Sequence, residues 1–391
     1  MLYPLSYEGV ERPGRRLRAG SRGRSTRRGA RSTGYRIAAG AVAGRGGRSG
    51  EETRAGAGDR GRGGLAEGAP AAPPPPPPPR PGRPPPGGGG GPPRDRSRAE
   101  TFAAAHGVER THGSYAELLA DPEVEVVYNP LANGLHGPWN LAALTAGKHV
   151  LTEKPSASNA AEAEEVRQAA NASGTVFMEA FHYLFHPVTR RLHELLASGE
   201  LGELRHAEAM VAIPAPEADD PRWSLSLAGG ALMDLGCYGL HALRVLAPWA
   251  GGAPHPVAAR AGERAGAPGV DEWLDADVLF PGGATGTARC HMAYGRLEMS
   301  LRIVGSRGEA TAPNFVLPQL DDRVVIRTAD GERTEHLGTR SSYAYQLEAY
   351  AARVRHGTPL PLDADDAVET MRLIDACYTA AGLSPRPRTA P

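Results

Sequence analysis

The amino-acid sequence predicts an α/β fold in two parts: a parallel sheet flanked by helices that lacks its first β-α-β unit, and then an α+β domain with an open, mainly antiparallel sheet. Between residues 94 and 178, short apolar strands alternate with helices of roughly 10 to 15 residues, which indicates β-α-β units. From residue 179 to residue 391, strand-like segments follow one another with glycine-rich turns, which favours antiparallel pairing. Residues 1–93 fit neither pattern.

Residues 1–93 consist mostly of Gly, Arg, Pro and Ala, with a run of proline at 73–79. Such a segment buries too little apolar surface to offset the entropy of ordering. We therefore expect a low-complexity segment that is either disordered or a mistranslation of GC-rich DNA. Residues 35–47 come nearest to a strand but are weak, so the first strand, its loop and the second strand are expected to be missing. Gly56 to Gly61 match Gly-x-Gly-x-x-Gly only as letters, because no apolar strand precedes them.

The segment 94–178 has clear element boundaries. Ser114 can cap a short helix that runs to Leu119, with Glu117 three residues along as in a capping box. Strands are expected where short runs are apolar and β-branched, and helices where the intervening stretches end in glycine. The expected strands are 124–128, 149–152 and 175–178, and the expected helices are 98–106, 136–146 and 159–172.

Two of these strands end in polar residues. Asn129 to Asn133 follow the first and Glu153 to Pro155 the second, and right-handed crossovers bring both ends to one edge of the sheet. Ligands of open parallel sheets bind at that edge. Only two lysines, Lys148 and Lys154, occur among the 44 basic residues of the chain. A lysine amine, unlike a guanidinium, can have its pKa lowered and exchange a proton, so Lys154 is a candidate for chemistry. The alternative is a surface lysine that escaped codon bias.

The second part begins with a helix at 188–198 and a strand at 204–213. A turn at Pro281-Gly282-Gly283 predicts a hairpin between 276–280 and 285–291, because glycine-rich turns join antiparallel strands. A helix at 364–381 is expected to close the fold.

A helix after Gly229-Gly230 carries the second group of candidate residues. At about 100° per residue, Asp234, Tyr238 and His241 fall on one side of it, opposite a stripe of leucines. Such a helix faces a core and a cleft at once. The alternative is that Tyr238 and His241 lie at a domain boundary with their hydrogen bonds satisfied, because tyrosine and histidine are intermediate in burial.

Composition excludes several classes of function. No apolar run approaches the roughly 20 residues needed to cross a bilayer. Three widely spaced cysteines fit neither a disulfide scaffold nor a metal site and indicate a reducing cytoplasm. Nucleic acid is not expected as a partner, since almost no aromatic residues interleave the N-terminal arginines. Glu179, His182 and His186 have helical spacing, but such sets are more often structural, so no metal is expected.

Four motifs in order resemble the glucose-fructose oxidoreductase, inositol dehydrogenase and MocA (Gfo/Idh/MocA) family, within it the dihydrodiol dehydrogenase and NADP-dependent xylose dehydrogenase branch. They are Tyr128 to His136, Ala146 to Pro155 with its Glu-Lys-Pro, Met178 to Phe181, and Gly229 to Tyr238. The resemblance runs from about residue 94 to residue 383. It implies a Rossmann-type dinucleotide-binding domain at 94–178, here incomplete, and a substrate and oligomerisation domain at 179–391.

The resemblance also implies a function. Members of the family it resembles transfer hydride between a nicotinamide and a sugar, polyol or diol carbon, with NADP or NAD as cofactor. Its catalytic residues fall on Lys154, Asp234 and Tyr238, where lysine stabilises a phenolate and the aspartate bonds lysine and substrate. His182 and His241 are expected to contact substrate, and a homodimer is expected by analogy. The cofactor residues carried over are Arg94, Asn129, Pro130, Asn133, His136, Glu153 and Lys154.

Two questions stay open at this level. Arg94 occupies the place where NADP-using relatives bind the 2′-phosphate, which favours NADP without deciding between the two cofactors. The missing glycine-rich loop leaves a second interpretation, a non-catalytic remnant or binding module that keeps the substrate domain but has lost the dinucleotide.

Overall fold

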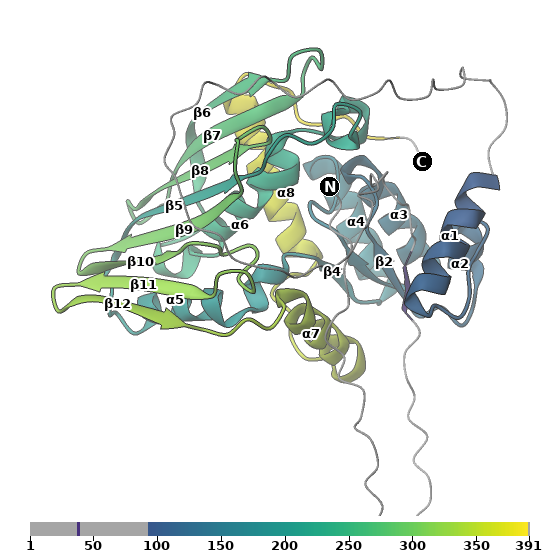
Figure 1. Ribbon diagram of the computed structural model, residues 1–391, viewed down its shortest axis with the longest axis horizontal. Helices are drawn as coiled ribbons and strands as arrows, with labels where there is room; N and C mark the ends of the chain where they lie inside the picture. The colour runs from purple at the N-terminus through teal and green to yellow at the C-terminus, as the bar shows by residue number, and fades with distance from the viewer. Residues whose placement is uncertain (1–36, 40–92, 390–391) are drawn as a thin grey trace, which may run out of the picture.

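The computed structural model describes residues 37–39 and 93–389. They form two sheets, one of four parallel strands and one of eight strands, with helices packed against both (Figure 1). Within the described residues, no helix combines the length and the apolar character that crossing a bilayer requires.

The parallel sheet has the strand order β1-β2-β3-β4, with β2 at Val126–Asn129, β3 at His149–Thr152 and β4 at Phe177–Glu179. The expectation that the first strand is missing is wrong in one respect. Within the weak segment 35–47, β1 at Ile37–Ala39 pairs in parallel with β2, so β2 is not an open edge. The glycine-rich loop and second strand would fall in residues 40–92, which lie outside the described residues.

Local signals explain most helix boundaries of this domain. The Ser114 hydroxyl accepts the backbone N–H of Glu117 at 3.1 Å, and the Glu117 carboxylate accepts that of Gly113 at 2.8 Å, one residue earlier than a capping box requires. The side chain of Asn159 caps the fourth helix in the same way. The helices are α1 at Pro93–His106, α2 at Tyr115–Ala120, α3 at Asn133–Thr145 and α4 at Ala160–Ser173.

The second sheet has the order β12-β11-β10-β9-β5-β8-β7-β6, in which only β5 and β8 pair in parallel. The predicted hairpin is confirmed, because β7 and β8 pair antiparallel on either side of the glycine turn. Helices α6 and α8 cover one face, and among the described residues the opposite face carries no helix (Figure 1). The strands are β5 at Leu204–Ala212, β6 at His255–Glu263, β7 at Asp271–Leu279, β8 at Thr285–His291, β9 at Glu298–Gly305, β10 at Gly308–Ala312, β11 at Arg323–Thr328 and β12 at Gly331–His336.

Further helical segments belong to the second part of the chain. They include α7, which the sequence patterns did not predict. Short 3₁₀ turns lie at Pro221–Trp223 (η2), Leu225–Leu227 (η3) and Ala247–Trp249 (η5). The remaining segments are η1 at His182–Phe185, α5 at Pro187–Ala197, α6 at Cys237–Arg244, α7 at Ser342–His356 and α8 at Ala364–Ala380.

The helix that carries the second group of candidates is not a regular α-helix. It opens with a π-helical turn, η4 at Leu232–Gly236, before α6 begins. A Cβ atom at Gly236 would lie 2.8 Å from the sulfur of Cys290, so the helix backbone sits directly against β8. The assumed 100° per residue therefore fails between Asp234 and Tyr238, because a π turn has more residues per turn and so rotates less than 100° per residue.

The C-terminal segment ties the two parts together. Helix α8 packs against both α4 and β6. Beyond it, the fully buried guanidinium of Arg386 pairs with the fully buried carboxylate of Asp271, which also accepts the backbone N–H of Leu232 at 2.7 Å. The division of the chain at residue 179 thus stays a prediction, since the end of the second part also builds the surface of the first.

Glu179, at the end of β4, is a buried carboxyl group. One oxygen accepts the backbone N–H of Ser156 at 2.7 Å, and the other finds no partner within the described part of the chain. Burial, with the nearby Asp366 carboxylate, raises the pKa of Glu179 to about 8. The group is therefore neutral in the folded protein at neutral pH.

Replacing Glu179 by Gln tests this assignment. The folded-state pKa of about 8 lies above the ordinary value of 4.5, so the proton on Glu179 stabilises the fold below pH 4.5, and this contribution is lost as the pH rises through 8. Gln keeps the acceptor for Ser156 and carries no charge. The free energy of unfolding of Glu179→Gln, relative to that of wild type, should therefore rise by roughly 2 to 4 kcal/mol between pH 5 and pH 8. Urea unfolding at both pH values measures this, with the exposed Glu194→Gln as control. An equal pH dependence in Glu179→Gln and wild type would contradict it.

Candidate active site

The turn that carries Lys154 lies at the predicted edge, directly after β3. The peptide bond between Lys154 and Pro155 is cis. Behind the turn, the buried Asn140 amide donates to the carbonyl of Ser156 at 3.0 Å and its oxygen accepts from Asn129 at 2.8 Å. Asn129, predicted to bind cofactor, is thus only 4% exposed and holds the end of β2 to α3.

His136 has a similar structural position. Its ring nitrogens lie 2.6 Å from the carbonyl oxygen of Pro155 and 2.8 Å from that of Leu131, and the ring is buried. Burial lowers its pKa to about 4, so the ring is neutral. Both nitrogens face backbone carbonyls of the loops after β2 and β3, and the single N–H of the neutral ring donates to one of them. The imidazole therefore lies between these two loops rather than projecting from them.

Lys154 reaches across to the second domain. Its Nζ donates to the backbone carbonyl of Asp234 at 2.6 Å and lies 3.6 Å from the Asp234 carboxylate. The same Nζ lies 4.9 Å from the centre of the Tyr238 ring. The side chains of Lys154 and Asp234 are only 12% and 13% exposed. The three residues predicted to be catalytic are therefore brought together.

Electrostatics keep this lysine charged. Burial alone would lower the pKa of Lys154, but Asp234 and, to a smaller extent, Cys237 and Glu153 outweigh it, so the pKa lies above its ordinary value. Asp234 in turn has a lowered pKa: burial would raise it, and the Lys154 and Arg222 cations outweigh that effect. Lys154 is a fixed cation here, not the amine with a lowered pKa that its residue type allowed.

Arg222 completes the cluster and was missed by the sequence patterns. Its Nε donates to the Asp234 carboxylate at 2.8 Å, and its terminal nitrogen donates to Asp220 at 3.1 Å. The glycine pair holds Arg222 in place, because Gly230 donates to the Arg222 carbonyl at 3.0 Å and a Cβ at Gly229 would lie 2.4 Å from that oxygen. No periodic signal marks Arg222, since it lies in a short 3₁₀ turn.

The hydroxyl of Tyr238 contacts a histidine from another element. It lies 3.1 Å from Nε2 of His182, whose Nδ1 lies 2.8 Å from the hydroxyl of Ser342. Burial, with the Lys154 charge, lowers the pKa of His182 to about 3. Burial also raises the pKa of Tyr238 well above its ordinary value. A neutral phenol and a neutral imidazole therefore face each other beside the Lys154 ammonium.

His241 does not join this cluster, although the helix pattern placed it there. The ring is fully buried and stacks on Phe181, with 4.0 Å between ring centres. Its Nδ1 lies 2.6 Å from the hydroxyl of Tyr183, and its Nε2 lies 3.3 Å from the carboxylate of Asp366. With both nitrogens engaged and no exposed surface, His241 has no free group to offer a substrate in this conformation. The π turn accounts for the difference, because it changes the helical phase.

The remaining predicted cofactor residues lie around the edge. Tyr128 donates its hydroxyl to Glu153 at 2.8 Å, which places a carboxylate beside Lys154. Pro130 is half-buried in the loop after β2. The amide of Asn133 donates to the carbonyl of Ala228 at 3.4 Å and so links α3 to the second domain. Arg94 falls in α1, but its side chain lies outside the described part of the structure.

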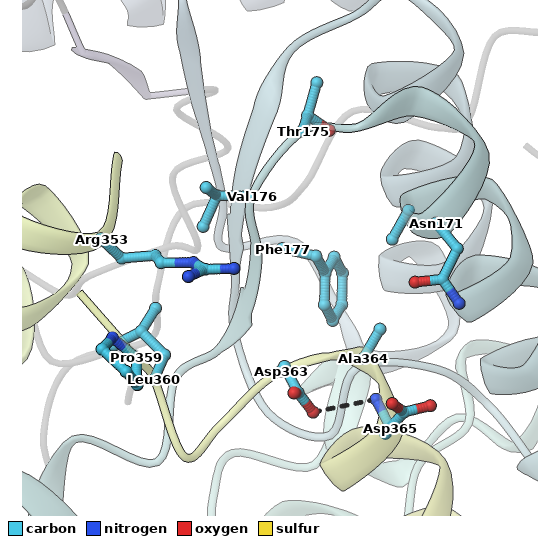
Figure 2. A pocket seen from close by; sticks show the side chains of 11 residues that line it. Asn171, Thr175, Val176, Phe177, Arg353, Pro359, Leu360, Asp363, Ala364 and Asp365 are labelled. Atoms are coloured by element: carbon cyan, nitrogen blue, oxygen red, sulfur yellow. Dashed lines mark hydrogen bonds between the residues drawn. The ribbon is translucent and has the colours of Figure 1, made fainter. Parts of the chain in front are cut away.

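A separate cavity of about 290 Å³ lies at the opposite end of β4 (Figure 2). It is bordered by Phe177 of β4, Asn171 of α4 and the loop between α7 and α8. The Asp363 carboxylate beside it accepts the backbone N–H groups of Asp365 and Asp366 and so caps α8. None of the Lys154 cluster lines this cavity, and both of its acids are engaged, Asp363 in the helix cap and Asp365 in an ion pair with Arg167.

The chemistry of the cluster fits the nicotinamide end of a dinucleotide. An ammonium, a carboxylate and an amide, those of Lys154, Glu153 and Asn133, stand at the carboxyl edge of a parallel sheet, where such ligands bind. The pyrophosphate end would meet the loop after β1, which lies outside the described residues. Among residues 37–39 and 93–389, no three His, Cys, Asp or Glu side chains are grouped closely enough to hold a metal ion.

Comparison with known proteins gives this geometry a context. Residues 93–181 match the family described as oxidoreductase family, NAD-binding Rossmann fold, and residues 189–311 match the GFO/IDH/MocA C-terminal domain. D-xylose 1-dehydrogenase (NADP(+)) 2 of Haloferax volcanii is 36% identical over 292 residues, covering 74% of this chain and 87% of the relative. Trans-1,2-dihydrobenzene-1,2-diol dehydrogenase of Mus musculus is 37% identical over 245 residues, covering 62% of this chain and 69% of the relative.

A solved structure extends the likeness to the fold. A 3-ketoreductase from Actinomadura kijaniata, in complex with NADP and TDP-benzene, superposes with a TM-score of 0.66 at 29% identity, over 73% of this chain and 86% of that one. The domain matches follow each other in the order the sequence motifs predicted, and the resemblance is confirmed. The chain therefore belongs to the Gfo/Idh/MocA family of NAD(P)-dependent oxidoreductases.

Proposed function

We propose that this oxidoreductase transfers hydride between NADP or NAD and a hydroxyl-bearing carbon of a sugar, polyol or diol, with Lys154, Asp234 and Tyr238 as its catalytic group. The observation that carries the proposal is the nearly buried Lys154 ammonium, held by Asp234 beside the Tyr238 ring at the carboxyl edge of the parallel sheet. The relatives named for xylose, dihydrobenzene diol and a 3-ketoreductase reaction support this class of substrate.

The residues divide the work by their charges. Oxidation of an alcohol removes a proton from oxygen and a hydride from carbon, and a bound nicotinamide would supply the hydride acceptor. Tyr238 takes the proton from the substrate oxygen as its own hydroxyl hydrogen passes to Nε2 of His182, 3.1 Å away. Lys154, kept cationic by Asp234, stabilises negative charge that develops on that oxygen in a site with little water. Asp234 positions Lys154, because Lys154 and Arg222 already engage its carboxylate.

Glu153, Lys154 and Asn133 are proposed to hold the nicotinamide and its ribose, with Pro130 shaping the loop and Arg94 favouring the 2′-phosphate of NADP. Asn129 and His136 support this site from behind, through their bonds to α3 and to the loops. His182 is proposed to border the substrate beside Tyr238. Three free, buried cysteines fit a reducing cytoplasm, where we place the protein.

Binding of NADPH tests the proposal directly. Because the matched Rossmann segment keeps the nicotinamide end of the site, we expect saturable binding in a fluorescence titration of the purified chain. NADH serves as the comparison and is expected to bind more weakly if Arg94 meets the 2′-phosphate. Absence of saturable binding of either nucleotide would favour the non-catalytic remnant instead.

Replacing Lys154 by Arg tests the catalytic cluster. A guanidinium keeps the charge, but it is planar and larger than an ammonium group. It therefore does not fit the space that Nζ occupies between the Asp234 carbonyl and the Tyr238 ring. We expect kcat to fall at least about 100-fold. Lys148→Arg is the matched control, since Lys148 precedes β3, at the other end of the strand from Lys154, and donates to the carbonyl of Asp121, so this variant should keep its turnover. Equal turnover of the two variants would remove Lys154 from the mechanism.

We also propose a homodimer through the face of the eight-stranded sheet that carries no helix. The half-buried side chains of Met210, Trp273 and Tyr294 line a hollow on this face. Around them lie three acids and three bases, so the face carries both signs of charge, which allows one surface to meet its own copy. The charged residues that line the hollow are Glu208, Asp275, Glu298, Arg260, Arg289 and Arg302.

Reversing one charge on this face should separate the subunits. Arg289 pairs with Glu208 at 2.7 Å, so Arg289→Glu places like charges together at each of two symmetric positions. Light scattering after size exclusion should show a dimer for wild type and a shift toward monomer for Arg289→Glu. Arg340→Glu reverses a charge before α7, away from the hollow, and should remain dimeric. A monomeric wild type would overturn the proposed interface.

A further inference from the structure

A chain of hydrogen bonds leads away from the Tyr238 hydroxyl. It passes to Nε2 of His182 at 3.1 Å, from Nδ1 of His182 to the Ser342 hydroxyl at 2.8 Å, and from there to the side-chain oxygen of Gln319 at 3.1 Å. Four separate elements supply these residues: α6, η1, the first residue of α7 and the loop between β10 and β11. Tyr238, His182 and Ser342 are each at least nine-tenths buried.

The last bond fixes the direction of the others. The oxygen of the Gln319 amide accepts only, so the Ser342 hydroxyl donates its hydrogen to Gln319. The Ser342 oxygen must then accept, and the hydrogen between it and His182 belongs to Nδ1. A neutral imidazole carries one N–H, so Nε2 is left as an acceptor. Tyr238 therefore donates its hydroxyl hydrogen to His182.

The surroundings keep His182 neutral. The Lys154 ammonium and the ring of His186 are the titratable groups that oppose a positive charge on it, and burial is the largest cause of its low pKa. The ring of Tyr343, from α7, packs on the imidazole with 4.0 Å between ring centres, and Tyr238 meets it edge-on. No carboxylate of the described residues bonds either nitrogen, so the His182 ring is neutral before a substrate reacts.

We propose that Ser342, oriented by Gln319, is a positioning residue that sets the tautomer of His182 and thereby directs the oxygen of Tyr238 toward the substrate. With its own hydrogen given to His182, the Tyr238 oxygen offers its lone pairs to a substrate hydroxyl. The other tautomer would place a hydrogen on Nε2, which would donate to Tyr238 and occupy a lone pair of that oxygen. The effect of this network on catalysis rests on the proposed function, whereas the tautomer of His182 does not.

The tautomer can be measured without any cofactor. Long-range ¹H–¹⁵N correlation spectra of histidine-labelled protein distinguish an Nδ1–H from an Nε2–H imidazole, and the signals lost in His182→Gln identify His182 among the 13 histidines. Wild type should show a neutral ring with Nδ1–H. Ser342→Ala should populate Nε2–H, whereas Ser342→Thr should retain the wild-type state because it keeps the hydroxyl.

Kinetics supply the second readout. Ser342→Ala should lower kcat about 10- to 100-fold, less than the ~10⁴-fold loss when a catalytic histidine is forced into the wrong tautomer. The KM for dinucleotide should stay unchanged, and Ser342→Thr should recover most of the loss. Ser341→Ala is the control, since the Ser341 side chain makes no capping bond at the start of α7. Should Ser342→Ala not fold, Gln319→Met removes the outer acceptor without changing α7, and the same shift toward Nε2–H is expected.

An Nε2–H or cationic His182 in wild type would overturn the inference, as would an Nδ1–H ring that persists in Ser342→Ala. A chain that shows the expected change of tautomer but binds no NADPH would support the positioning network and overturn the proposed function. The two failures are therefore distinguishable.

Discussion

The contact between Lys154 and Asp234 is the interaction on which the candidate site depends. A nearly buried ammonium is costly unless an opposite charge and hydrogen-bond acceptors replace its water. Asp234 supplies both, through its carboxylate at 3.6 Å and its backbone carbonyl at 2.6 Å. Because Lys154 follows a strand of the first domain and Asp234 lies on a helix of the second, the same contact also orients the two domains at the edge where the cofactor would enter.

Asp234 lies within the π turn, and this turn is fixed at both ends. The backbone N–H of Leu232, at its start, is held by Asp271, and Gly236, at its end, lies against β8. Both contacts join residues that are distant in sequence. The sheet, rather than the regular α-helical hydrogen-bond pattern, therefore determines the geometry of this turn. Arg222 then secures the carboxylate from the opposite side. The acid is thus held within the second domain by contacts that do not involve the lysine, which is the preorganisation that an electrostatic catalyst needs.

Local patterns predicted what local chemistry decides. The strand at 149–152, the glycine hairpin and the Ser114 cap all depend on neighbouring residues, and the structure agrees with them. Helix α7 was missed because its buried face includes the polar Ser342 and Gln346, which weakens the apolar periodicity. Arg222 and Gln319 were missed because they lie in irregular segments whose partners are distant in sequence. The triad itself was found through the family motifs, since no spacing connects residue 154 to residue 234.

Three buried histidines show why burial alone does not identify a functional imidazole. His136 faces two backbone carbonyls, and His241 lies between a tyrosine and a carboxylate, so both are tied to the framework on each side. His182 instead bonds the phenol that faces Lys154, and its other nitrogen leads out through two side chains, Ser342 and Gln319, rather than to the backbone. A substitution can remove a side-chain hydrogen-bond partner, but it leaves a backbone carbonyl in place. Substitution can therefore change the tautomer of His182, whereas the backbone partners of His136 do not allow this.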